Sequence, residues 1–114
     1  MRAIVSKISE VGTLCYEADI DNYKDYYKHL ECNCFDVVMV KWQEHDISIF
    51  VDDEGMLKKG NLGRIVKGYN IPLFGNMVIC GGVDEEGETL PLPEDFNLLN
   101  INAFISPVCY KIKE

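Results

Sequence analysis

Long apolar runs and a secretory leader are missing from this sequence of 114 residues. No stretch approaches the ~20 consecutive apolar residues that a membrane-spanning helix needs. The first residues, 1–7, lack the apolar segment of a signal peptide. We therefore expect a cytoplasmic protein that has no membrane partner.

Histidine is scarce, and this limits the catalytic chemistry that the chain can perform. Only His29 and His45 could act as imidazole bases, and no Gly-x-Ser-x-Gly nucleophile motif occurs. Nothing in the spacing pairs a cysteine nucleophile with His45. Zinc usually takes four ligands in pairs such as Cys-x2-Cys, whereas Cys32 and Cys34 are closer together and have no second pair. We predict no catalytic residue, no metal site and no cofactor, and therefore a protein that is not an enzyme.

Positive charge is also in short supply. Eleven basic residues face 19 acidic ones, so the formal net charge is −8. Because phosphate-backbone binding depends on clustered Lys and Arg, we expect no general nucleic-acid binding. Residues 1–57 hold 5 basic and 12 acidic side chains, a net charge of −7. This acidity keeps a small protein soluble and can steer basic partners toward it. The acidic runs at 52–54 and 84–88 are interpreted as solvated turns, because neither has the EF-hand spacing.

The cysteines form an odd set of five without a secretory signal: Cys15, Cys32, Cys34, Cys80 and Cys109. Disulfides are rare in the reducing cytosol. Cys15, Cys80 and Cys109 lie in apolar, strand-like segments, where cysteine packs as a small buried hydrophobe. We expect free thiols.

Apolar residues alternate along the first half of the chain, which predicts strands. These segments are residues 2–8, 13–18, 35–42 and 47–51. Apolar residues on both faces of 37–40 favour a central strand that is covered on both sides. Between the second and third segments, Tyr23, Tyr26, Tyr27 and Leu30 follow helical spacing behind an N-cap at Asp21 or Asn22, which predicts a helix over 23–30.

The second half of the chain carries weaker patterns. Three glycines in 58–69 indicate irregular structure with one helical turn at 62–67, and 74–83 contains a buried strand. Pro93 followed by two acids is typical of a helix start, and Val108–Ile112 alternates like a closing edge strand. We therefore predict a single α+β domain over residues 1–114, with a mainly antiparallel sheet of five to seven strands and one or two helices packed on it. Edge strands at the termini would also allow a homodimer.

One basic, glycine-rich segment runs against the acidic trend. Residues 58–68 combine three glycines with four cations and contain no acid. Backbone N–H groups of such loops can hold an anion, and arginine binds phosphate through two N–H groups. The segment matches neither the P-loop nor the dinucleotide fingerprint, and a solvated basic loop is the alternative. The candidate ligand-binding residues are Lys58, Lys59, Asn61, Arg64 and Lys67.

From Phe35 onward the order of features resembles a small protein family, domain of unknown function 3846. The similarity consists of a strand and acidic turn at 49–55, a loop with Asn61 and Arg64, and a Gly-x-x-Val-Ile-x-Gly strand at 75–81. The resemblance covers about residues 3–100. It implies an origin in bacterial phages, plasmids or conjugative elements, and it carries over no catalytic residue.

Two functions follow as hypotheses. The first is a non-enzymatic binding protein of a phage or mobile element that acts on a host protein, such as a defence component. The second is a protein that sequesters a phosphorylated or nucleotide small molecule near residues 58–68.

Overall fold

A five-stranded antiparallel sheet forms the centre of the fold, in a computed structural model that describes residues 1–113. The alternating segments of the first half supply four of its strands, and the fifth comes from the second half. The strand order is β2-β1-β7-β4-β3. Their bounds are β1 (Arg2–Ser9), β2 (Gly12–Asp19), β3 (Phe35–Trp42), β4 (His45–Asp52) and β7 (Met77–Gly81).

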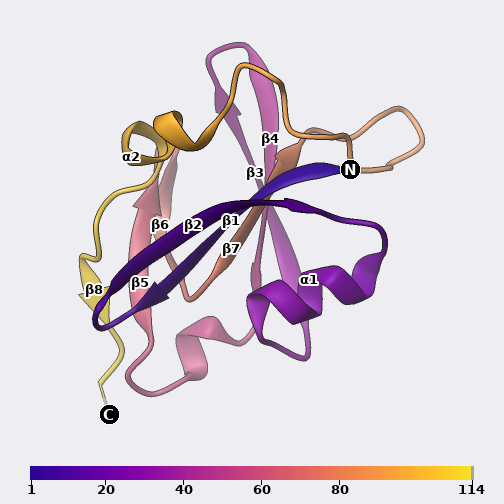
Figure 1. The fold of residues 1–114 in the computed structure, drawn as a ribbon. Helices are drawn as coiled ribbons and strands as arrows, with labels where there is room; N and C mark the ends of the chain where they lie inside the picture. The colour runs from indigo at the N-terminus through magenta and orange to yellow at the C-terminus, as the bar shows by residue number, and fades with distance from the viewer. Residues whose placement is uncertain (114) are drawn as a thin grey trace.

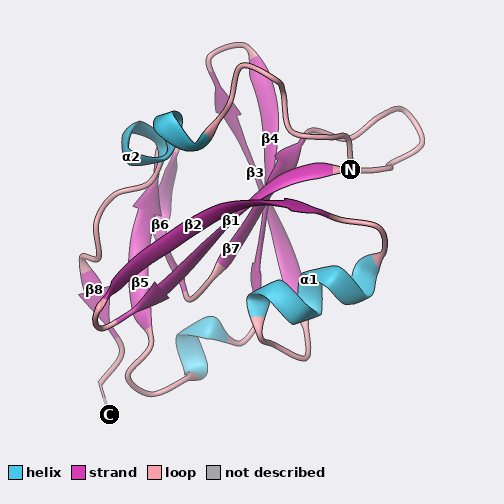
Figure 2. Ribbon diagram, in the orientation of Figure 1, coloured by secondary structure: helices cyan, strands magenta, loops and turns pink. Residues whose placement is uncertain are grey.

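A second, three-stranded sheet packs on one face of the first and has the order β6-β5-β8. It consists of β5 (Leu62–Val66), β6 (Tyr69–Phe74) and β8 (Tyr110–Lys111). The expected α+β class with a mainly antiparallel sheet is confirmed, and strands make up most of the regular structure (Figure 2). The helical turn expected at 62–67 is wrong, because Gly63 lies under the Phe74 ring, where an added Cβ would be 2.6 Å from a ring carbon. This close approach holds the segment in the extended pairing with β6.

The helix α1 (Tyr23–Leu30) covers the opposite face of the central sheet (Figure 1). Asn22 is its N-cap: the Asn22 side chain accepts the Lys24 N–H, and the Asp25 carboxylate accepts the Asn22 N–H in return. The buried Tyr26 ring stacks on Phe50 with ring centroids 4.2 Å apart. The helix prediction is confirmed, although Tyr23 at the start of the apolar stripe is exposed.

The segment after β7 runs across the end of the central sheet and then enters its second-sheet face. Arg2 on β1 holds it: the Arg2 guanidinium donates to the carbonyls of Pro93 and Phe96 at 2.8 and 2.7 Å. These contacts keep 91–97 out of a helix, so the helix start expected at Pro93 is wrong. Helical structure begins later, with η2 (Leu98–Asn100) and α2 (Ile101–Phe104). Phe96 is fully buried there against Trp42 and Phe104.

The central position expected for β3 is also wrong. β7 inserts between β1 and β4, which leaves β3 paired only with β4 at one edge of the sheet. Val37 and Met39 on β3 are 43% and 47% exposed. A short helical turn, η1 (Gly55–Leu57), follows β4. Within residues 1–113, no helix is long and apolar enough to cross a membrane.

Candidate functional site

The basic segment at 58–68 is anchored at its start by contacts within the protein. Lys58 forms an ion pair with Asp52 at the end of β4. The Asn61 amide donates to the Gly55 carbonyl at 2.8 Å, and its oxygen accepts the Leu62 N–H at 3.0 Å. Both side chains thus make their contacts within the connection from β4 to β5. In this arrangement they have a structural role.

The five candidate residues do not gather around one point. Lys59 precedes β5 and is exposed, whereas Lys67 follows β5 and is exposed at its other end. Arg64 lies between them with its side chain turned into the protein, only 1% exposed. The structure therefore places none of the other four candidate residues beside the Arg64 side chain.

Arg64 is instead a buried connector between the two sheets. Its Nη1 donates to the Ser6 hydroxyl at 2.6 Å, and its Nη2 donates to the Ser6 and Gly75 carbonyls at 3.2 and 3.1 Å. All three acceptors are neutral, and no ion pair to Arg64 forms within the described residues. Burial lowers the pKa of Arg64 to about 10, so the guanidinium is still charged at neutral pH.

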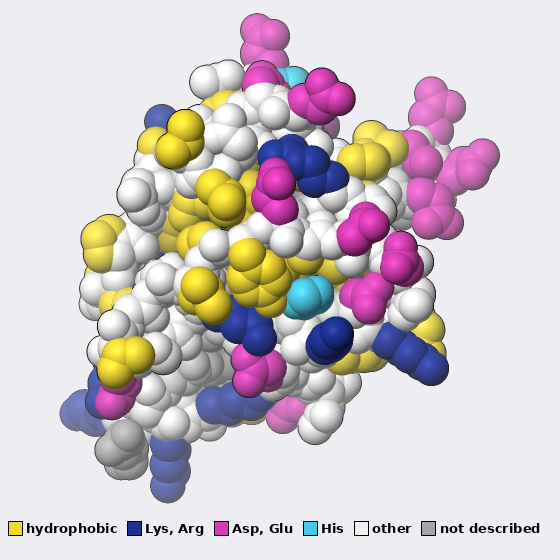
Figure 3. All heavy atoms as spheres, viewed as in Figure 1, with side chains coloured by type: hydrophobic (Ala, Val, Ile, Leu, Met, Phe, Trp, Pro, Cys, Tyr) yellow, Lys and Arg dark blue, Asp and Glu magenta, His cyan; other side chains and the backbone are white. Residues whose placement is uncertain are grey.

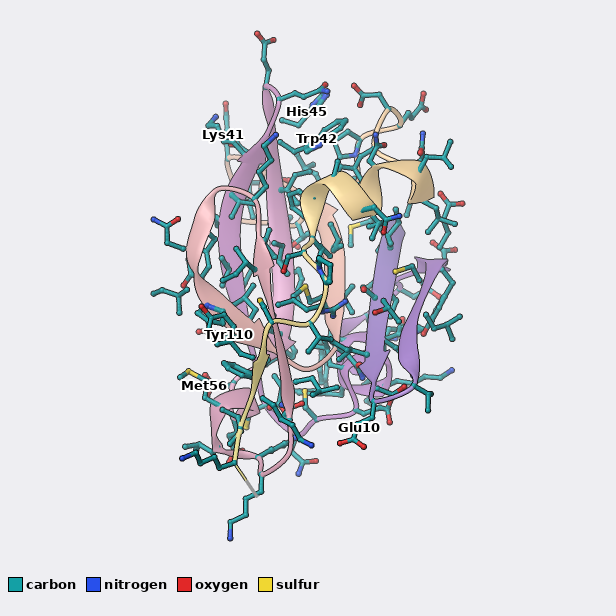
Figure 4. The ribbon with its side chains drawn as sticks, turned by 90° about the vertical axis from the view of Figure 1, so that its left-hand side faces the viewer. Glu10, Lys41, Trp42, His45, Met56 and Tyr110 are labelled. Atoms are coloured by element: carbon teal, nitrogen blue, oxygen red, sulfur yellow. The ribbon has the colours of Figure 1, made fainter. Side chains whose placement is uncertain are left out.

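A groove runs between the free edge of β3 and the free edge of β6, with a volume of about 390 Å³. Its apolar walls come from both strands and from η1: Val38, Met56, Leu57, Tyr69, Ile71 and Pro72. Asp36, Asp52 and Asp53 also line it, and the described lining residues include no lysine or arginine. Figure 4 shows Met56 and Lys41 toward opposite ends of this side of the molecule. The groove is therefore apolar with an acidic margin.

The β3 edge beside this groove carries backbone groups that no neighbouring strand pairs. The Val37 N–H bonds to the Asp36 side chain at 2.8 Å, so it points away from β4. In an antiparallel pair every second residue points outward in this way, which places the Met39 amide on the same free edge. Residues 37–40 are all apolar, whereas exposed edges are usually protected by charge, proline or a bulge. This edge is chemically able to accept another strand.

The two histidines have local partners. His29 Nδ1 lies 2.8 Å from the Tyr16 hydroxyl, and His45 Nε2 lies 3.1 Å from an Asp95 carboxylate oxygen. No group of three or more metal-ligating side chains comes together among residues 1–113. The described cysteines carry no disulfide, and burial raises the pKa of Cys80 to about 12.

The sequence did not predict the groove, because its two walls belong to strands far apart in the chain. The only local signal was the run of apolar residues at 37–40, which we interpreted as the mark of a central strand. A run of apolar residues is typical of a central strand, and only the insertion of β7 between β1 and β4 shows that this run lies at an edge.

Comparison with known proteins gives one match. The family model described as Domain of unknown function (DUF3846) matches residues 1–104. This confirms the resemblance seen in the strand, turn and loop order. No curated protein and no solved structure matches the chain.

Proposed function

We propose, from the premise that the chain belongs to the DUF3846 family, that it is a non-enzymatic protein that binds another protein. The setting we expect is a phage or mobile element, and the expected partner is a protein of the bacterial host, such as a defence component. One observation carries the proposal: an apolar groove with an acidic margin lies beside an unprotected strand edge. The class of partner follows from the chemistry of these two features.

The partner contributes an extended segment that adds to β3. Backbone N–H and C=O groups of β3 would pair with it, which is how strand addition to a sheet edge provides affinity. Apolar side chains of the segment would fill the groove beside Met56 and Ile71, which are 61% and 55% exposed. Basic side chains would face Asp36 and Asp53. The net charge of −8 speeds the encounter with such a segment and makes it sensitive to salt.

A site-specific cross-link tests this mode of binding. A photo-reactive amino acid at Met39 is expected to capture a host protein through an extended segment that is basic and apolar. Amide exchange should slow at residues 37–41 when the purified partner binds. Met39→Lys places a charge on the edge and should lower affinity at least about tenfold.

Leu14→Lys is the matched control, because Leu14 is an exposed apolar residue on β2, the other edge strand of the same sheet. This variant should bind as the wild type does. Recovery of no stoichiometric partner at low and moderate salt contradicts the proposal, as does a partner whose affinity Met39→Lys leaves unchanged. If sedimentation showed a homodimer paired through β3, the occupant of this edge would be a second copy of the chain and not a foreign protein.

A phosphorylated or nucleotide ligand held near 58–68 is a separate hypothesis with its own test. Thermal-shift screening against nucleotides should show stabilisation that disappears when Lys59 and Arg64 become alanine. Since Lys59 and Arg64 do not converge, the geometry favours protein binding as the first function.

A further inference from the structure

The free edge of β3 is blocked at one end by the turn between β5 and β6. In the antiparallel pair with β4, the backbone groups of Val37, Met39 and Lys41 all point to the free side. A Cβ added at Gly68 would lie 3.8 Å from the Lys41 carbonyl oxygen, so the turn fills the place in which an added strand would continue. For a strand that pairs with β3, the edge therefore ends before Lys41.

Contacts within the protein hold this turn in place. The Lys67 N–H donates to the Phe104 carbonyl at 2.8 Å, and Val66 and Ile105 form a β-bridge beside it. Val66, Phe104 and Ile105 are all buried in the core on the second-sheet face. An incoming strand would have to disturb these buried contacts to move the turn aside.

The two ends of the β3–β6 groove differ in charge. Asp36 and Asp53 line the end beside η1. Tyr69 lines the other end, directly after Gly68, and Lys67 lies on the turn before it. Lys67 is exposed, and no ion pair to it forms within residues 1–113. The blocked end thus offers an unpaired positive charge, whereas the open end is acidic.

We propose that the segment added to β3 is the carboxyl-terminal tail of the partner protein, with its terminal carboxylate beside Lys67. This inference rests on the proposed function, because it concerns the same edge and groove. A strand that meets the turn has to end there or leave the sheet, and a chain end needs no detour of the backbone. Its carboxylate complements the unpaired lysine. The tail runs parallel to β3, because β3 approaches the turn with its own carboxyl end.

The residues of β3 that face the groove define the side chains of the tail. Asp36 and Val38 line the groove, whereas Val37 and Met39 do not. Since alternate residues of an added strand face the same side, the last residue and the third from the end are apolar. The fifth from the end is lysine or arginine and faces Asp36. It lies about 13 Å from the last residue along a strand, the same spacing as from Asp36 to Val40.

Selection from two peptide libraries tests the proposal. One library displays short random segments with a free carboxyl terminus, and the other displays the same segments between fixed flanking residues. The first should enrich tails with the stated order of side chains, and the second should enrich none. Enrichment from the flanked library, alone or equally, would overturn the assignment of a chain end and leave strand addition intact. Enrichment from neither library would contradict the proposed function as well.

Calorimetric titration of the best tail isolates the role of its carboxylate. Amidation of the carboxyl terminus should weaken binding at least about threefold, because it removes one charge pair at an exposed site. Lys67→Glu should weaken the free-carboxylate tail by at least as much and leave the amidated tail unchanged. Lys24→Glu is the matched control, because Lys24 is exposed on α1 at the opposite face of the central sheet, and it should change neither affinity.

Met39→Lys shows whether the tail lies on the β3 edge, and it should weaken both forms of the tail. The proposal is overturned by any one of three results. These are equal binding of the free and amidated tails to the wild type, equal affinities of the Lys67→Glu and Lys24→Glu variants for the free tail, and a tail whose affinity Met39→Lys leaves unchanged.

Discussion

The two faces of the central sheet are built in different ways. On the helix face, α1 covers a cluster in which Tyr26, Phe35 and Phe50 contact one another, and the buried members of that cluster are all apolar. On the other face, strands and irregular segments from the second half of the chain cover the sheet, and Arg64 is buried among them. The second-sheet face differs because it buries a charged side chain, Arg64, whose Nε–H has no hydrogen-bond partner, and because it borders the β3–β6 groove.

The side chains on the surface are also unevenly distributed. Figure 3 shows acidic side chains gathered around the loop after β7 and hydrophobic side chains exposed beside α2. A closed apolar face serves stability, whereas a face assembled from distant segments leaves edges and cavities between them. The proposed binding site, the β3–β6 groove, borders the second-sheet face, and four substitutions can break or sharpen this comparison.

The largest effect is expected from Phe50→Ala, which empties the centre of the helix face. Phe50 contacts both Tyr26 and Phe35, and removing a buried phenyl ring costs about 3–5 kcal/mol in the free energy of unfolding. Urea unfolding measures the change. Val11→Ala is the control, because Val11 is 98% exposed and its loss should change stability by about 0.5 kcal/mol or less. A Phe50→Ala variant as stable as this control would contradict the closed face.

Arg64→Met is expected to have the next largest effect, on the second-sheet face. The variant leaves the Ser6 and Gly75 carbonyls without their donor, at about 1–3 kcal/mol for each buried unsatisfied group. It also removes the cost of burying a charge, so we expect a net loss of about 1–3 kcal/mol. The same urea experiment measures it. If the variant were more stable than the wild type, the connector role of Arg64 would be refuted.

Asn22→Ala tests how much the local capping of α1 contributes to the stability of the helix face. Asn22 accepts the Lys24 N–H at 2.9 Å and closes the capping box with Asp25, so its loss should cost about 1 kcal/mol. Asn22→Ser retains a capping oxygen and should restore most of that stability. Circular dichroism and urea unfolding of both variants provide the measurement. If both variants were as stable as the wild type, the cap would contribute nothing and tertiary packing alone would hold α1.

The smallest effect concerns His29, which bridges α1 and β2 through the Tyr16 hydroxyl. Burial, with Lys7 and Lys28 nearby, lowers the pKa of His29 in the folded protein, and Asp25 opposes this shift. Because the folded pKa lies below the unfolded value of 6.5, the unfolded chain binds the proton more readily. Stability should therefore fall as the pH drops below about 6.5, and His29→Gln should reduce that fall. Unfolding midpoints at pH 7.5 and 5.5 compare the two proteins.

Much of the first half could be predicted from the sequence. Strands β1 to β4 and helix α1 were expected within a few residues of their observed bounds. Their signals are local: alternation along a strand, helical spacing on one side, and a capping asparagine. Of the candidate site, the sequence suggested Arg64 as one of five anion-binding residues in a loop, whereas the structure buries its side chain between the two sheets. Burial of Arg64 depends on Ser6 and Gly75, which lie 58 residues before it and 11 after it.

By itself, then, the sequence determined the α+β class, the first hairpin, the capped helix and the excess of acid, because each depends on composition or on neighbours within a few residues. The tertiary structure alone decided that β7 enters between β1 and β4, that β3 becomes an edge, and that an arginine is buried between the two sheets. These outcomes depend on pairings between segments far apart in the chain. Many such pairings satisfy the same local pattern, and only packing of the whole core selects one of them.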